Sequence, residues 1–220
     1  MNKRSFKKGS ASYPSEIYLR GRPSERQKLF FASRTRYTAY GGARGGGKSW
    51  ALRRKLILMA LHYSSIRILI IRRTLSELRE NHILPMLSEL RGLAQFSESK
   101  KIFDFPSGSR ITLGYMDSER DVLRYQGQEY DVIAIDEATQ LTEYQFSTLK
   151  ACLRGANGLP KRMYLTCNPG GVGHAWVKRL FIDRVFQANE DPDDYSFIPA
   201  KVYDNEILVN SDPDYVKQLE

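Results

Sequence analysis

The chain has 220 residues, enough for one substantial domain, of which 41% are hydrophobic and 27% charged. No apolar run approaches the ~20 residues that span a bilayer, no apolar signal-peptide core follows the basic N-terminus, and the two cysteines, Cys152 and Cys167, form no metal-binding pattern. The net charge of +9 is unevenly distributed, since residues 1–60 carry 15 Lys and Arg against 2 Asp and Glu. This basic N-terminal segment indicates that a polyanion, either nucleic acid or nucleotide phosphates, lies nearby. A solvated tail would also explain the charge of residues 1–12.

Residues 1–14 are predicted to be a flexible basic tail and residues 15–205 a single domain. The predicted strands are 36–40, 67–71, a hairpin of 102–105 and 109–116, 132–135, 163–166 and 196–202. The predicted helices are 49–63, 75–90 with an irregularity at Pro85, one capped by Thr142 and stopped by Gly155, one through Trp176 and Phe181, and one starting at Asp212-Pro213. Strands that alternate with helices favour an α/β fold with a largely parallel sheet, in which ligands bind at the carboxyl ends of the strands.

The first chemical motif lies between the first predicted strand and helix. Gly42–Ser49 satisfies the pattern G-x-x-x-x-G-K-[ST] of a phosphate-binding loop. Glycines reach the positive-φ conformations that turn backbone N–H groups toward phosphate oxygens, and the following helix adds the positive end of its dipole. Lys48 is predicted to bridge the β- and γ-phosphates and Ser49 to bind Mg²⁺. The predicted ATP-binding residues are Gly42, Ala43, Arg44, Gly45, Gly46, Gly47, Lys48, Ser49 and Trp50.

Arg44 lies inside this loop and has two readings. Its guanidinium could reach the γ-phosphate or a neighbouring carboxylate and so take part in catalysis, or it could be an exposed loop cation.

The second motif is a pair of carboxylates at the end of the apolar run 132–135. A buried strand can hold Asp136 rigidly beside a metal, and Glu137, one residue on, would polarise the attacking water. A solvated acidic turn is the alternative, and the phosphate-binding loop argues against it. Because the pair supplies a general base for water, it favours hydrolysis coupled to mechanical or switching work over phosphate transfer to a substrate.

Four segments together resemble the N-terminal ATPase region of phage large terminase subunits, over roughly residues 24–205: Gly41–Ser49, Ile71–Thr74, Asp131–Ala138 and Thr166–Gly171. The resemblance implies a P-loop NTPase of the glutamate-containing (ASCE) type, with a mostly parallel central sheet flanked by helices. It implies an ATP-hydrolysing motor, with ATP and Mg²⁺ as cofactors, that couples hydrolysis to translocation of double-stranded DNA into a capsid. The partners it implies are double-stranded DNA, a homo-oligomeric ring on a capsid portal and the small terminase subunit, in the host-cell cytoplasm and without a membrane.

The resemblance also implies roles for single residues. Thr166 and Asn168 match a coupling motif that senses the γ-phosphate or the attacking water, although Asn-Pro could simply set a turn. Arg124 matches the arginine that a neighbouring subunit supplies to the reacting phosphate, with a surface salt bridge as the alternative and Arg120 and Arg154 as rivals. Gln27 lies where the family contacts adenine, although an ordinary helix-surface glutamine would fit as well.

The resemblance implies that full-length members carry a second, C-terminal nuclease domain, and we expect no room for it in these 220 residues. We expect residues 206–220 to begin a linker toward it. We interpret the acidic residues of 190–194 as a loop and expect ATPase activity without DNA cleavage from this chain. Two other functions stay open: a helicase- or recombinase-like ATPase acting on single strands, and a nucleotide-binding assembly switch with little turnover, against which Glu137 argues.

Overall fold

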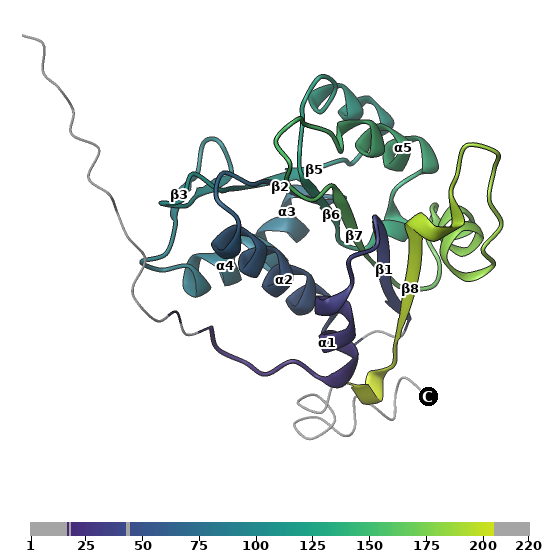
Figure 1. The fold of residues 1–220 in the computed structure, drawn as a ribbon, viewed down its shortest axis with the longest axis horizontal. Coiled ribbons are helices and arrows are strands. Elements are labelled where there is room, and N and C mark those ends of the chain that lie inside the picture. The colour runs from purple at the N-terminus through teal and green to yellow at the C-terminus, as the bar shows by residue number, and fades with distance from the viewer. Residues whose placement is uncertain (1–16, 18, 43–44, 205–220) are drawn as a thin grey trace, which may run out of the picture.

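The computed structural model describes residues 17, 19–42 and 45–204, so the predicted tail, linker and helix at Asp212 lie outside the described residues. Its centre is an eight-stranded sheet in the order β3-β4-β5-β2-β6-β7-β1-β8 (Figure 1). The strands are β1 (Tyr37–Gly42), β2 (Arg67–Arg72), β3 (Gln95–Ser97), β4 (Ile102–Asp104), β5 (Arg110–Tyr115), β6 (Val132–Ile135), β7 (Arg162–Cys167) and β8 (Tyr195–Ala200). From β5 to β8 every pairing is parallel, whereas β3, β4 and β5 pair antiparallel. The predicted α/β class and the hairpin are therefore confirmed.

Helices cover both faces of the sheet. On one face lie α1 (Glu25–Ala32), α2 (Lys48–His62) and an irregular helix made of α3 (Leu75–Leu78), the π-turn η1 (Arg79–Ile83) and α4 (Leu84–Glu89). On the other lie α5 (Glu143–Cys152) and α6 (His174–Val177), which continues as the π-turn η4 (Lys178–Ile182). Short 3₁₀ turns make up the rest: η2 (Glu119–Arg124), η3 (Ala138–Gln140), η5 (Pro192–Asp194) and η6 (Val202–Asp204).

Strand β6 shows why the central strands are apolar throughout. Val132 and Ala134 belong to the core cluster under α2, whereas Ile133 and Ile135 belong to the cluster under α5 and α6. All four are fully buried, because successive side chains of a strand point to opposite faces and both faces are covered. The sheet thereby holds the residues that follow β6 in a rigid position.

Pro85 explains the irregular helix. In a regular α-helix the amide of residue 85 would donate to the carbonyl of Asn81, but proline has no N–H and its ring crowds that carbonyl. The helix widens into the π-turn, where the Leu84 amide donates to the carbonyl of Arg79. Arg53 of α2 supplies the missing donor, with its Nη1 2.5 Å from the Asn81 oxygen. The irregularity predicted at Pro85 thus lies in the turn before it.

The predicted capping box of α5 is present. The Thr142 side chain accepts a bond from the Gln145 amide at 3.3 Å, and the Gln145 side chain accepts one from the Thr142 amide at 2.9 Å. The helix ends at Cys152, before Gly155. Strand β3 was not predicted, because its three residues at the sheet edge are only half-buried or exposed and form no apolar run.

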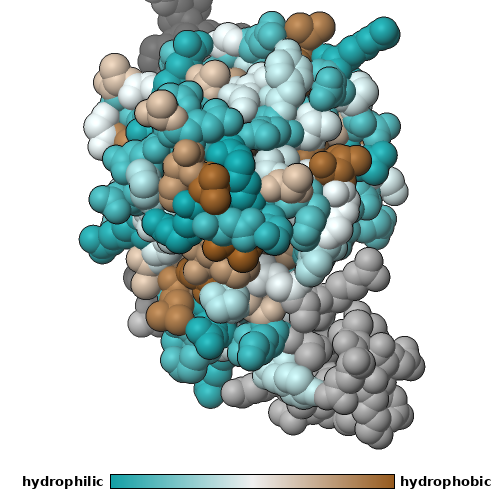
Figure 2. Space-filling view, turned by 90° about the vertical axis from the view of Figure 1, so that its right-hand side faces the viewer, coloured by the Kyte–Doolittle hydropathy of each residue, from teal (hydrophilic) through white to brown (hydrophobic). Residues whose placement is uncertain are grey.

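The side of the molecule that carries β8 presents its apolar residues as separate small patches in a mainly hydrophilic surface (Figure 2). Within the described ranges, no helix is long and apolar enough to cross a membrane.

Candidate active site

The phosphate-binding loop connects the carboxyl end of β1 to the start of α2. Gly42 has a φ of 138°, and a Cβ there would lie 2.1 Å from the carbonyl oxygen of Ala200, so glycine is required for the pairing with β8. Gly47 has a φ of 65° at the N-terminus of α2 and is also in the left-handed region. The loop predicted from the sequence is therefore followed directly by the helix, while Ala43 and Arg44 lie outside the described residues.

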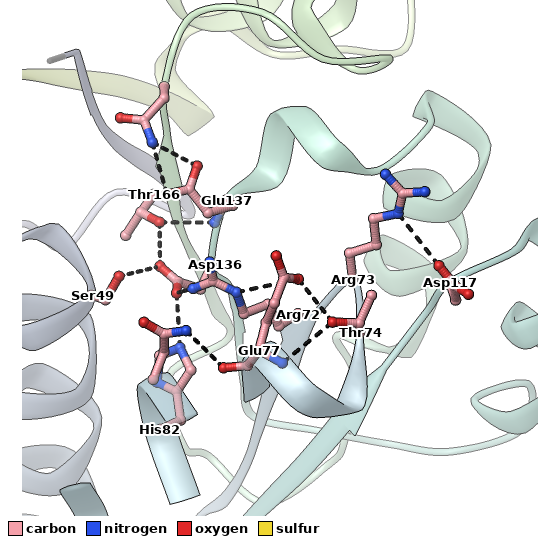
Figure 3. A network of polar contacts seen from close by, with 12 residues as sticks. Ser49, Arg72, Arg73, Thr74, Glu77, His82, Asp117, Asp136, Glu137 and Thr166 are labelled. Atoms are coloured by element: carbon pink, nitrogen blue, oxygen red, sulfur yellow. Dashed lines mark hydrogen bonds and ion pairs between the residues drawn. The ribbon is translucent and has the colours of Figure 1, made fainter. Parts of the chain in front are cut away.

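Asp136, directly after β6, lies at the centre of a polar network (Figure 3). Its side chain is fully buried and receives four side-chain contacts. On Oδ1, the Ser49 hydroxyl donates at 3.0 Å and the Thr166 hydroxyl at 2.5 Å. On Oδ2, Arg72 donates through Nη1 and His82 lies 2.9 Å away through Nε2. Side chains from four elements, α2, β2, η1 and β7, thus meet at one carboxylate.

The two adjacent carboxylates have opposite electrostatic environments. Burial acts to raise the pKa of Asp136, but the contacts from His82, Arg72 and Thr166 outweigh it and hold the pKa below the usual value. Burial and the neighbouring charge of Asp136 raise the pKa of Glu137, against the attraction of Lys48. Asp136 is therefore suited to stay ionised beside a cation, and Glu137 to accept a proton.

Thr166 and Asn168, at the end of β7, contact this pair directly. The Thr166 hydroxyl accepts a bond from the Glu137 amide at 3.0 Å while donating to Asp136. The Asn168 side-chain amide lies 2.7 Å from each carboxylate oxygen of Glu137. Glu137 itself has a φ of 59°, a strained backbone for a residue other than glycine and one often found at functional sites. Two side chains at the end of β7 thus hydrogen-bond Glu137, and their role in coupling stays a prediction.

A cavity of about 390 Å³ lies beside the network. Lys48, which is buried, and Glu137 both line it, so the loop and the carboxylate pair face one space. Ser49 connects that space to Asp136. Among the described residues, the side-chain oxygens of Gln140 and Asn168 are buried without a hydrogen-bond partner. The lining residues are Gly45, Gly46, Gly47, Lys48, Ser49, Trp50, Arg72, Glu137, Gln140 and Asn168.

Gln27 lies close to the loop but contacts its backbone. The buried side chain accepts a bond from the Ser24 amide at 3.0 Å and donates to the Gly47 carbonyl at 3.3 Å. These bonds fasten α1 to the start of α2. Each polar atom can make one further hydrogen bond, so these contacts do not test a contact with adenine, which stays a prediction.

Arg124 lies in η2, with its guanidinium 4.7 Å from the centre of the Tyr115 ring and 3.0 Å from Asp121. Its side chain is half exposed. Tyr115 ends β5 level with Arg72, so Arg124 lies near the sheet edge that carries the site. The rival Arg154 pairs with Glu129 at 3.5 Å, before the amino end of β6. A role for Arg124 in a neighbouring subunit stays a prediction.

The acidic residues of 190–194 lie in a connecting segment, as expected. Glu190 pairs with Arg179 at 2.7 Å, Asp191 caps the short turn η5, and Asp194 lies 4.0 Å from Arg36. In the part of the chain that the structure describes, no three His, Cys, Asp or Glu side chains are grouped to hold a metal ion. The absence of DNA cleavage stays a prediction.

Three site residues were missed from the sequence: Arg72, His82 and Gln140. Arg72 ends a buried strand, and its place there was a usable signal because strand ends meet at one edge of a parallel sheet. Gln140 follows Glu137 by three residues, within the turn η3. His82 gave no signal, since its direction depends on the π-turn.

Comparison with known families decides the relationship. Residues 34–220 match the family model of the phage terminase large subunit. The chain belongs to this family. Its fold is that of the terminase ATPase domain, a P-loop NTPase with a mostly parallel sheet between helices, as predicted. A search of curated protein sequences found no match.

Solved structures of terminases are similar in fold. The large terminase of a thermophilic bacteriophage has a TM-score of 0.70 and 19% identity over 90% of this chain and 49% of its own. The complex of that terminase with ATP-gamma-S has a TM-score of 0.65 and 18% identity over 84% of this chain and 46% of its own. The Thermus phage P74-26 large terminase ATPase domain has a TM-score of 0.63 and 13% identity over 90% of this chain and 92% of its own. The terminase chain described here therefore spans about half the length of the thermophilic bacteriophage protein.

Proposed function

We propose that this chain binds ATP with Mg²⁺ and hydrolyses it, as the motor domain of a phage large terminase that drives double-stranded DNA into a capsid. One observation carries the proposal: the phosphate-binding loop, with Lys48, and the carboxylate Glu137 line one cavity, with Asp136 directly behind Ser49. The large terminase of the thermophilic bacteriophage, similar in fold, has been solved in complex with ADP and with ATP-gamma-S. Family membership supports the coupling to DNA packaging.

The donor set fits magnesium. The hydroxyl of Ser49 and Oδ1 of Asp136 are 3.0 Å apart, which places two oxygen ligands side by side at the cavity wall. Mg²⁺ prefers oxygen ligands, retains several waters and is commonly shared with substrate phosphates. Ser49 and Asp136 would hold the ion, which supplies charge neutralisation to the phosphates when bound.

The residues of the chain divide the remaining tasks. The amides of Gly45–Lys48 and the Lys48 ammonium would bind the phosphates, since the loop ends at a helix N-terminus. Glu137 would accept the proton of the attacking water, and the raised pKa of this carboxyl suits that step. The second hydrogen of the same water would be accepted by the unpaired side-chain oxygen of Gln140 or of Asn168. Asn168 and Thr166 would then carry the change to β7.

The Glu137→Ala variant tests the hydrolytic step. We expect kcat to fall by roughly 10²–10⁴-fold, the usual contribution of a general base, while ATP binding measured by calorimetry stays unchanged because the loop is intact. Glu129→Ala, an exposed glutamate before β6, is the matched control and should keep wild-type turnover. Unchanged turnover in Glu137→Ala would remove this residue from the mechanism.

The ring is tested by mixing two inactive variants. In a ring, a Glu137→Ala subunit can still supply Arg124 to a neighbour whose Glu137 is intact. We therefore expect a mixture of Glu137→Ala and Arg124→Ala chains to recover part of the ATPase activity that each lacks alone. An absence of recovery, in mixtures shown to co-assemble, would argue against Arg124 as the residue provided in trans.

A further inference from the structure

His82 is a buried residue that the sequence motifs do not assign. Its ring is 0% exposed, and its Nε2 lies 2.9 Å from Oδ2 of Asp136. Within the described part of the chain its Nδ1 has no hydrogen-bond partner. This arrangement fits a ring that donates through Nε2 to the carboxylate.

The π-turn delivers His82 to this place. A π-turn inserts an extra residue into a helix and so rotates the side chains within it relative to a regular helix, and such turns are frequent at functional sites. The cause of this π-turn is local, since Pro85 lacks the N–H that would donate a hydrogen bond to the Asn81 carbonyl. Arg53 from α2 bonds that carbonyl at 2.5 Å and so holds the π-turn against the helix that begins with Lys48 and Ser49.

The contacts of Asp136 separate by oxygen atom. Oδ2 faces His82 and Arg72, which reaches it from the end of β2. Oδ1 faces the hydroxyls of Ser49 and Thr166. A hydroxyl can exchange its partner for water or a cation, whereas the buried imidazole and guanidinium stay in place. One oxygen is thus anchored and the other is turned to the loop.

We propose that His82, delivered by the π-turn η1, is a positioning residue that anchors Oδ2 of Asp136 and so holds Oδ1 beside Ser49 for magnesium. This inference rests on the proposed function, in which Asp136 is a ligand of the magnesium ion. Residues that hydrogen-bond metal ligands orient them, and losing such a residue costs roughly 10–100-fold in metal affinity. Arg72 shares the oxygen and acts with His82.

The test measures magnesium-dependent nucleotide binding, without turnover. A fluorescent ATP analogue is titrated onto the folded chain at increasing Mg²⁺, and the half-saturating Mg²⁺ concentration is recorded. In His82→Phe, which fills the space without a donor, we expect this concentration to rise by roughly 10–100-fold. Nucleotide binding in EDTA should stay unchanged, since the loop amides are intact. His82→Gln, which keeps an amide donor, should recover part of the shift.

Met86→Ala is the matched control, because Met86 lies in the same irregular helix, is 0% exposed and has no side-chain donor that could hydrogen-bond Asp136. It should lower stability without moving the magnesium midpoint. A wild-type midpoint in folded His82→Phe, or an equal shift in Met86→Ala, would overturn the role of His82 and leave the proposed function standing. A wild-type chain that binds no nucleotide would overturn both.

Discussion

Two aspartates at opposite ends of strand β6 show how one fold uses the same residue in two ways. Asp131 precedes the strand and Asp136 follows it, and each is 1% exposed. Asp131 accepts bonds from the Arg67 amide at 2.8 Å, Asn157 at 2.8 Å and Lys161 at 2.9 Å. These partners fasten the segment before β7 to the amino ends of the strands.

Asp136 has partners of another kind. They are side chains from four elements, and two of them, Ser49 and Arg72, also line the cavity with Lys48 and Glu137. Burial of a carboxylate is therefore no sign of function by itself. The distinguishing features are partners that can be exchanged and a space beside them, both at the carboxyl edge where the loops of a parallel sheet open.

The largest difference between Asp136 and Asp131 should appear in the rate of ATP hydrolysis. Asp136→Asn replaces the charged oxygen beside Ser49 by a neutral group, so we expect kcat for ATP to fall by at least about 100-fold, on the scale of losing one electrostatic contact to the reacting groups. Asp131→Asn should keep wild-type kcat, because its end of the strand does not face the cavity. Steady-state hydrolysis of both variants checks this, and equal losses would erase the distinction.

Asp131 should affect the stability of the fold, whereas Asp136 affects catalysis. Asp131→Ala leaves the partly buried Lys161 with only the neutral oxygens of Asn157 and Leu159 and takes a bond from the Arg67 amide, so we expect the free energy of unfolding to fall by roughly 3 kcal/mol. Urea denaturation followed by circular dichroism measures it. Asp131→Asn keeps the shape but also removes the charge, so it should lose nearly as much; a much smaller loss would show that hydrogen bonds and packing, and not the charge, are the cause.

Lys55 allows the stability of the amino end of the sheet to be tested through its dependence on pH. It is buried in α2, donates to three carbonyls of Phe30, Phe31 and Ser33, and burial lowers its pKa to about 7. Because the unfolded chain binds this proton up to its ordinary pKa of 10.5, stability should rise between pH 7 and 10.5 and show no slope from this group below that window.

The rise is at most a few kcal/mol, at ~1.4 kcal/mol for each pKa unit, and the three carbonyl bonds to the ammonium reduce it. Lys55→Met lacks the group, so the difference in unfolding free energy between wild type and variant, measured from pH 6 to 10, isolates its contribution. A flat difference would show that the carbonyls keep the ammonium charged throughout this range.

The smallest effect should come from the exposed ion pair at this end. Arg154 and Glu129 lie 3.5 Å apart, and both side chains are about half exposed. Because water screens such pairs, Arg154→Ala should change the free energy of unfolding by less than about 0.5 kcal/mol. A larger loss in thermal denaturation would mean that Arg154 stabilises the parallel bridge between Tyr130 and Leu153.

Local patterns carried much of the fold and the site. The buried strand 132–135, the capping box at Thr142 and the helix that follows the glycine-rich loop are each set by neighbouring residues, and all three are present as predicted. The carboxylate pair follows the same rule, since its place at a strand end is readable from the apolar run before it. The mostly parallel sheet followed from the alternation of strands and helices.

The sequence by itself determined which residue types form the candidate site, because a glycine-rich loop with lysine and serine, and carboxylates at a strand end, are each readable within a short segment. Only the tertiary structure decided which distant groups complete the site. His82 reaches Asp136 through a π-turn, and Gln27 is turned to the backbone of Gly47. Pro85 indicates the irregularity locally, but the direction in which the π-turn places His82 depends on packing against α2 and β6. The order of the strands likewise brings together residues more than fifty positions apart, and no local pattern encodes that order.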